Sequence, residues 1–300
     1  MTMLKRIFLF WLVNIAVIAL FSIILFVLQA VFWIDVAAMA GEWYVWLLIY
    51  AAIFWFLWAF FSLFISRWMA KRAYGITPLT ESDLYSLSKK EKLVWDTVME
   101  ISNKHGINMP EVGIYTSQDP NAFATWATKN SSLVAVSTGL LDLMSDDEVE
   151  AVVAHEMAHI LNGDMVTMTL LQGVMNTFVI FFARIIAEFI NARTDGKLGV
   201  FGFMAVYIVL QIILWLLASI VVMAFSRHRE FRADEGASRY VWKEKMIRAL
   251  EALKRVVHPK EDPKFATMQI STQTSRGFKK LFMSHPPLDE RIANLDNFRY

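Results

Sequence analysis

Four long apolar runs constrain this chain more than any other feature of its sequence. They cover residues 7–34, 43–65, 165–182 and 200–225. A helix needs about 20 consecutive apolar residues to cross the hydrocarbon core of a bilayer. We therefore predict four hydrophobic helices and an integral-membrane protein. The run at 165–182 is the weakest, and a buried core helix is the alternative reading for it.

Composition agrees with this prediction and narrows the chemistry. Hydrophobic residues make up 56% of the chain and charged residues only 19%, against about 45–50% and about 25% in an ordinary globular protein. The net charge of +1 gives no reason to expect a nucleic-acid partner. The chain contains no cysteine, so a bound metal would need histidine or carboxylate ligands.

The basic residues predict an orientation in the membrane. Lys5 and Arg6 precede the first run, and Arg67 and Lys71 follow the second, whereas the link between these runs has no lysine or arginine. By the positive-inside rule the N-terminus and the part after residue 67 are cytosolic. The turn at 191–197 carries two basic residues and weakly opposes this orientation. A cleaved signal peptide is disfavoured, because its apolar region would span only about 7–15 residues.

The runs divide the chain into four predicted parts. Residues 1–66 form a transmembrane hairpin, and 67–164 form the first cytosolic part. Residues 165–225 form a second hydrophobic hairpin, and 226–300 form a polar, mostly helical C-terminal part. The hairpin at 165–225 returns the chain to the side of the membrane that it left.

The first cytosolic part combines helical and strand-like segments. A helix is predicted near 82–105, and short strands near 113–115 and 133–136. Ser145 and Glu148 form a capping-box pattern, so a long helix should begin there. We therefore predict a mainly α-helical membrane protein with an α+β part that contains a small sheet.

The chemical signal lies on that long helix. His155, Glu156 and His159 form an HExxH pattern. Residues i and i+4 share one face of a helix, so both imidazoles can reach a single ion. Glu156 lies about 100° round the helix from His155, where its carboxylate can contact a metal-bound water. The pattern predicts one Zn²⁺ per chain, because zinc lowers the pKa of its bound water and the adjacent carboxylate can take the proton.

A third protein ligand is needed, and residue type alone leaves several candidates. They are Glu230, Asp234, His228, His258 and His285. Glu230 and Asp234 are spaced i, i+4 on an expected helix, so one could bind zinc while the other fixes an imidazole tautomer. A solvated helix face is the alternative reading of this pair.

Longer motifs add a family resemblance. Residues 155–164, with the sequence HEMAHILNGD, and 226–234, with SRHREFRAD, resemble the HtpX family of bacterial membrane zinc proteases. This family is related to the CAAX prenyl proteases. The resemblance extends over nearly the whole chain, including Asn121 to Ala124, Ser137 to Leu141, and the segment that contains His285 and Arg291.

The resemblance implies roles for individual residues. It implies His155, His159 and Glu230 as zinc ligands, Glu156 as general base, and Asp234 as a residue that orients a ligand. It also implies a gluzincin-type core in the bacterial cytoplasmic membrane and a role in protein quality control and the stress response.

Further residues are candidates for substrate and transition-state contacts. Val134, Ala135 and Val136 could pair with an extended substrate as an added strand; an ordinary core strand is the alternative. Asn121 could hydrogen-bond the substrate backbone, although it also suits a turn. His285 or Arg291 could stabilise the oxyanion, unless their segment only holds a loop–helix junction.

The predicted function is hydrolysis of peptide bonds in misfolded or damaged membrane proteins, on the cytosolic side, by a zinc endopeptidase. Polypeptides and the lipid bilayer are the expected partners. Two alternatives remain: a protease that processes prenylated peptides, and a membrane chaperone or adaptor without catalysis.

Overall fold

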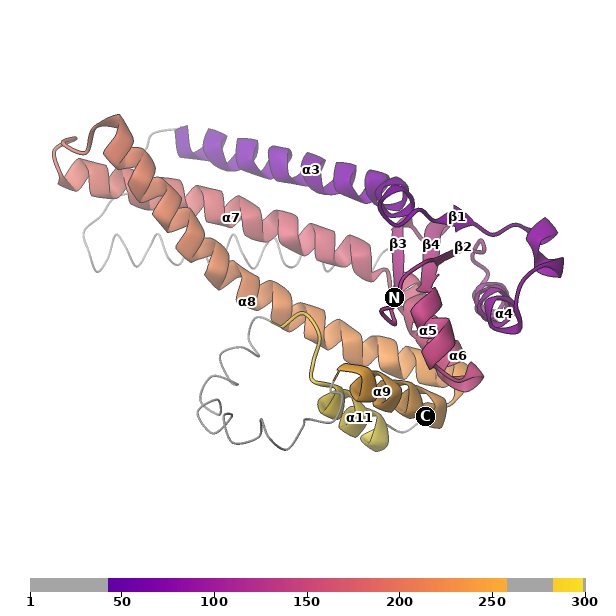
Figure 1. The fold of residues 1–300 in the computed structure, drawn as a ribbon. Helices are drawn as coiled ribbons and strands as arrows, with labels where there is room; N and C mark the ends of the chain where they lie inside the picture. Colours follow the sequence, from indigo (N-terminus) through magenta and orange to yellow (C-terminus); the bar gives the residue numbers. More distant parts are fainter. Residues whose placement is uncertain (1–42, 258–282, 299–300) are drawn as a thin grey trace. The chain divides into compact units, whose positions relative to one another are not determined.

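The computed structural model describes residues 43–257 and 283–298, and Figure 1 shows their elements along the chain. The apolar run at 7–34 lies outside the described residues. The elements are α3 (Trp43–Tyr74), β1 (Thr77–Pro78), η1 (Glu81–Tyr85), α4 (Lys89–His105), β2 (Glu111–Tyr115), β3 (Ala122–Thr128), β4 (Ser131–Ser137), α5 (Thr138–Leu143), α6 (Asp146–Asn162), α7 (Asp164–Arg193), α8 (Gly199–Val241), α9 (Lys243–Val257) and α11 (Leu288–Asn297).

The described residues form two compact units. The helical unit contains 43–61 and 169–219, and the sheet unit contains 62–168, 220–257 and 283–298. Helices α3, α7 and α8 each run from one unit into the other. The predicted boundaries at 66/67 and 225/226 therefore fall inside continuous helices rather than in linkers.

The helical unit has the properties of a membrane-embedded region. Three helices among the described residues are long and apolar enough to cross a bilayer: Ala51–Tyr74, α7 and α8. Many large apolar side chains of α8 are exposed, including Phe201 at 91% and Trp215 at 53%. Exposed apolar faces of this extent suit contact with lipid rather than water. The predicted run at 165–182 lies within α7.

The sheet unit contains a small mixed sheet with the strand order β1-β2-β4-β3. Strand β4 pairs in parallel with β2 and antiparallel with β3. The residues of β4 from Leu133 to Val136 are fully buried, which explains their continuous apolar sequence. The two predicted strands are present and slightly longer than predicted, whereas β1 and β3 were not predicted.

Helix α6 carries the HExxH pattern and is limited at both ends by local signals. The backbone N–H of Ser145 donates a 2.8 Å hydrogen bond to the Glu148 carboxylate, as the capping-box prediction requires. Gly163 ends the helix with a φ of 69°, a left-handed conformation that glycine adopts at little cost. The helix at 82–105 begins later than predicted, because Ser88 caps α4 and η1 precedes it.

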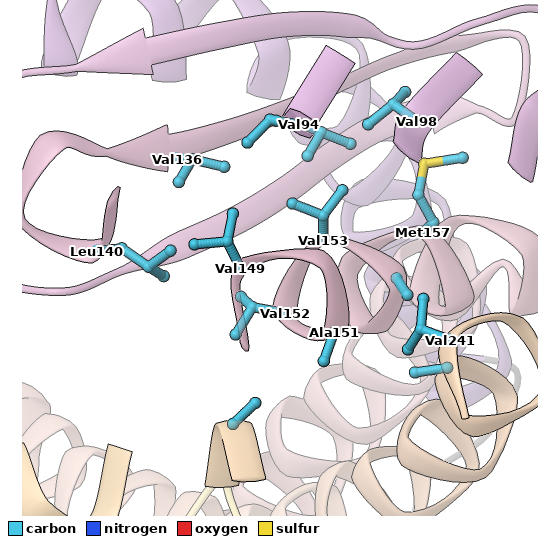
Figure 2. Close-up of a cluster of buried hydrophobic side chains, with 14 of the residues drawn as sticks. Val94, Val98, Val136, Leu140, Val149, Ala151, Val152, Val153, Met157 and Val241 are labelled. Atoms are coloured by element: carbon cyan, nitrogen blue, oxygen red, sulfur yellow. The ribbon is translucent and has the colours of Figure 1, made fainter. Parts of the chain in front are cut away.

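A hydrophobic core fixes α6 in place (Figure 2). Helix α6 packs against α4, α9 and β3. Figure 2 shows valine, leucine and methionine side chains from these layers meeting between the sheet and the helices, among them Val94, Val98, Val136, Val153 and Met157. Each of these five is fully buried. The core therefore holds one face of α6 and leaves its opposite face for chemistry.

Helix α8 approaches α6 closely. A Cβ atom at Gly236 would lie 3.0 Å from the Cβ of Ala158, so the absence of a side chain allows the two helices to come this near. Gly236 lies six residues after Glu230 on the same helix. The contact thus positions Glu230 against the helix that carries the two histidines.

Candidate metal centre

Three ligand-type side chains converge between α6 and α8. One ligand atom from each of His155, His159 and Glu230 lies within 4.8 Å of the other two. The Nε2 atoms of the two histidines are 3.2 Å apart. Glu230 Oε2 lies 3.5 Å from His155 Nε2, and Glu230 Oε1 lies 3.4 Å from His159 Nε2. Of the candidate third ligands in the described residues, Glu230 is the one in this cluster.

This arrangement fits a zinc ion. With zinc–ligand distances of about 2.1 Å, tetrahedral geometry separates neighbouring ligand atoms by about 3.4 Å. The observed separations of 3.2, 3.4 and 3.5 Å are close to that value. Glu230 Oε2 is buried, and its neighbours His285 Nδ1 at 2.9 Å and Arg291 Nη1 at 3.4 Å do not form hydrogen bonds of good geometry with it, so this oxygen can still bind a cation. The donor set and its spacing therefore suit a catalytic zinc site.

Two carboxylates contact the imidazoles on the side away from the cluster and so fix their orientation. Asp234 Oδ1 lies 2.9 Å from His155 Nδ1, and Asp164 Oδ2 lies 2.7 Å from His159 Nδ1. Donation from each Nδ1–H leaves each Nε2 lone pair directed into the cluster. The structure thus places Asp234 where the sequence predicted an orienting residue, and it assigns the same position on the second histidine to Asp164.

Asp164 is the functional candidate that the sequence reasoning missed. It follows the helix terminator Gly163 and begins α7, and its carboxylate lies 2.7 Å from His159 Nδ1. Its side chain is buried. Burial opposes the charged form of His159, but hydrogen bonds to Asp164 and Glu230 outweigh burial and raise the pKa of His159 to about 10. A site with this excess of negative charge favours a bound cation.

Arg291 differs from its predicted role. Its side chain is 7% exposed, and its guanidinium donates two hydrogen bonds to Asp234, of 2.6 and 2.8 Å. Arg291 Nη1 also lies 3.4 Å from Glu230 Oε2. A buried guanidinium held in this way is not available to bind substrate. The prediction of a substrate contact is corrected: Arg291 contacts the residues that hold the metal ligands.

Glu156 lies beside the cluster on the next position of α6. Burial raises the pKa of Glu156, while the neighbouring His155 and His159 oppose this rise. Its carboxylate also accepts a hydrogen bond from the backbone N–H of Ala124 in β3. A carboxylate next to two histidines that could hold a metal ion is the arrangement that a general base requires.

The sheet corrects the predicted substrate strand. Both edges of β4 are occupied, by β2 and by β3. Val134, Ala135 and Val136 therefore have no free backbone edge, and pairing of β4 with substrate is excluded. Strand β3 ends the sheet on this side, and its outer edge, called the open edge below, pairs with no strand of the described residues.

The two remaining candidates lie near this region. Asn121 is exposed directly before β3, and its backbone exchanges contacts with Ser137: its N–H donates to Ser137 Oγ and its carbonyl accepts from the Ser137 N–H, both at 2.9 Å. His285 is 65% exposed, and its Nδ1 lies 2.9 Å from Glu230 Oε2. His285 thus faces the metal cluster, whereas Asn121 lies at the start of the open strand.

The fold and the site together define a class. Two histidines on one helix, a glutamate on a second helix and a further carboxylate beside them are the arrangement of a zincin-like metallopeptidase. The three candidate membrane spans add that this metallopeptidase is of the membrane type.

Comparison with known proteins identifies the family. Residues 88–299 match peptidase family M48, and the chain belongs to that family. Curated proteins named protease HtpX are similar over nearly the full length. The protein from Alkalilimnicola ehrlichii is 47% identical over 302 residues, covering 99% of both chains, and that from Idiomarina loihiensis is 47% identical over 98% of this chain and 100% of its own.

A solved structure supports the fold independently. The crystal structure of S. mikatae Ste24p matches with a TM-score of 0.61 over 98% of this chain, at 19% sequence identity. The chain spans 65% of the length of that structure. At this level of identity the likeness concerns the fold alone.

Proposed function

We propose that the chain is an integral-membrane zinc endopeptidase whose ion is held by His155, His159 and Glu230. The observation that carries the proposal is the convergence of these three ligands beside Glu156. Bound zinc would supply a Lewis acid that polarises a carbonyl and acidifies water. The remaining chemistry belongs to side chains of the protein.

Glu156 acts as the general base in this mechanism. Its carboxylate takes a proton from the attacking water and later delivers it to the leaving amine. The carboxylates of Asp234 and Asp164 keep both imidazoles in the tautomer that presents Nε2. Arg291 keeps Asp234 in position.

Strand β3 binds the substrate in this proposal. In an antiparallel pair the backbone groups alternate between the partner strand and the opposite side. The Asn121 carbonyl faces β4, because it accepts from Ser137. By alternation, the backbone groups of Ala122 and Ala124 face away from β4; the Ala124 N–H donates to Glu156, and the backbone groups of Ala122 remain for the substrate. An extended peptide added there would run along the strand that already contacts Glu156.

His285 and Asn121 have supporting roles. The exposed imidazole of His285 lies next to Glu230 and can donate to the oxygen that gains charge during attack. Asn121 precedes the open strand and can hydrogen-bond the peptide backbone. Both roles remain predictions carried over from the sequence.

We also propose the location and the substrate class. The distribution of basic residues supports a cytosolic N-terminus and a cytosolic active site. The similarity to bacterial proteins named protease HtpX and the apolar helices support the bacterial cytoplasmic membrane as the location. Misfolded or damaged membrane proteins are the substrates that the family resemblance of the sequence implies.

Cleavage of casein by the purified protein in detergent tests this function. Activity should disappear with a chelator and return with added Zn²⁺. Cleavage that persists in chelator would contradict a metallopeptidase. If casein stays intact while a prenylated C-terminal peptide is cleaved, the prenyl-processing alternative replaces the proposal. Zinc binding without cleavage of either substrate would instead favour a chaperone or adaptor.

A further inference from the structure

The helical unit contains two amide side chains that its apolar surroundings do not explain. Asn176 lies on α7 and Gln211 on α8. Polar side chains within membrane spans are costly and mark functional positions by default. Each amide is only partly satisfied by its own helix: Gln172 Nε2 donates to Asn176 Oδ1 at 2.8 Å, and Gln211 Nε2 donates to the Tyr207 hydroxyl at 2.9 Å.

These two hydrogen bonds use one end of each amide and leave the other end, a donor on Asn176 and an acceptor on Gln211. The Asn176 Nδ2 group is a donor, and Gln211 Oε1 is an acceptor. Neither has a partner among the described residues. If either amide were rotated by 180°, the roles of its two ends would exchange, but each helix would still present an unused amide group. An unpaired amide in an apolar medium is costly, so a ligand that pairs with both groups is favoured.

Both amides line the same cavity. It has a volume of about 320 Å³, and its other walls are apolar and aromatic: Trp55, Val179, Ile180, Ile212 and Trp215. A mostly apolar pocket with a few converging polar groups is the usual form of a small binding site. Both helices also carry residues of the metal centre, because α7 begins with Asp164 and α8 contains Glu230.

We propose that this cavity binds a peptide group in the apolar segment of a membrane-protein substrate. A peptide group offers one N–H donor and one carbonyl acceptor, which match the acceptor of Gln211 and the donor of Asn176. A segment that unwinds for cleavage loses its helical hydrogen bonds, and in a bilayer it needs protein partners to replace them. A lipid acyl chain could also enter an apolar cavity, but it has no polar group that pairs with the two amides. This inference rests on the proposed function and specifies its substrate class.

Matched substrates and variants test the proposal. One substrate joins an unstructured cleavable segment to a 20-residue Leu/Ala helix, and the other lacks the helix. In nanodiscs, the double variant Asn176→Leu, Gln211→Leu loses both hydrogen bonds to the peptide group. Its kcat/KM for the anchored substrate should therefore fall about tenfold. Cleavage of the unanchored substrate should not change. Ser219→Ala is the control, because in the described part of the chain its hydroxyl on α8 donates to the Leu216 carbonyl of its own helix and has no other partner.

A crosslinking experiment keeps the proposal testable if the double variant folds poorly. A photoreactive residue replaces Ile212, which lines the cavity and is 55% exposed, in a Glu156→Gln background. Crosslinks to the apolar helix of the anchored substrate are expected. Crosslinks only to lipid, or only to residues 7–34 of the same chain, would overturn the proposal. An equal loss of kcat/KM for the anchored and the unanchored substrate in the double variant would also overturn the proposal. If the native protein cleaved neither substrate, the peptidase function itself would be contradicted.

Discussion

At the scale of single residues, the site depends on chains of contacts that begin outside the metal cluster. His155 contacts Asp234, Asp234 contacts Arg291, and Arg291 also contacts Glu230. Each of these side chains is buried. A buried carboxylate that loses its cationic partner is strongly destabilised. The C-terminal helix α11 thereby contributes to the geometry of ligands on α6 and α8.

Replacing Arg291 by alanine should therefore weaken metal binding. Because Asp234 would no longer be held against His155, the affinity for zinc should fall about 10–100-fold. Competition with a zinc-sensitive dye measures this affinity. Arg248→Ala is the control, since Arg248 forms a half-exposed ion pair with Asp147 and such pairs contribute little. An unchanged affinity in Arg291→Ala would show that Arg291 does not position the ligands.

At the scale of elements, the substrate site depends on which strand has an open edge. Strand β3 supplies that edge, and the alternation of its backbone gives a period of two. N-methylation of a peptide substrate removes one N–H at a time. Cleavage should fall when the methyl group replaces an N–H that faces β3 and should change little at the positions between. A uniform response along the peptide would contradict strand addition.

The sequence predicted elements where local signals are strong. Ser145 and Gly163 mark both ends of α6, and the continuous apolar run at 133–136 marks β4. It could not reveal β3, because Ala122–Thr128 mixes small and aromatic residues directly after a turn signal. The boundary at 225/226 follows a change from apolar to polar composition, yet α8 continues because nothing there interrupts its backbone hydrogen bonds.

The candidate site, like the fold, was predicted from the sequence only in part. The ligand pair His155 and His159 follows from helical spacing alone. The contact between Asp164 and His159 depends on how α6 ends at Gly163, and the contact between Arg291 and Asp234 joins residues 57 positions apart. Contacts of these two kinds depend on tertiary structure, which a pattern in one segment does not specify.

At the scale of the whole molecule, the proposal fixes which side of the membrane each part faces. The chain contains no cysteine, so an introduced cysteine is a unique label. Tyr85 in the sheet unit is 99% exposed, and the Lys197 side chain in the turn between α7 and α8 is 79% exposed. With an impermeant maleimide on intact cells, Lys197→Cys should be labelled and Tyr85→Cys should not. The opposite pattern would place the active site outside the cytosol.

In the proposed mechanism, Glu156 performs proton transfer at a metal held by His155, His159 and Glu230. The most direct test measures zinc content and casein cleavage on the same preparation of Glu156→Gln. We expect about one zinc per chain, as in the native protein, and a loss of cleavage of at least about 100-fold, because general-base catalysis contributes roughly 10²–10⁴ in rate. Native-like cleavage by a zinc-loaded Glu156→Gln protein would contradict it.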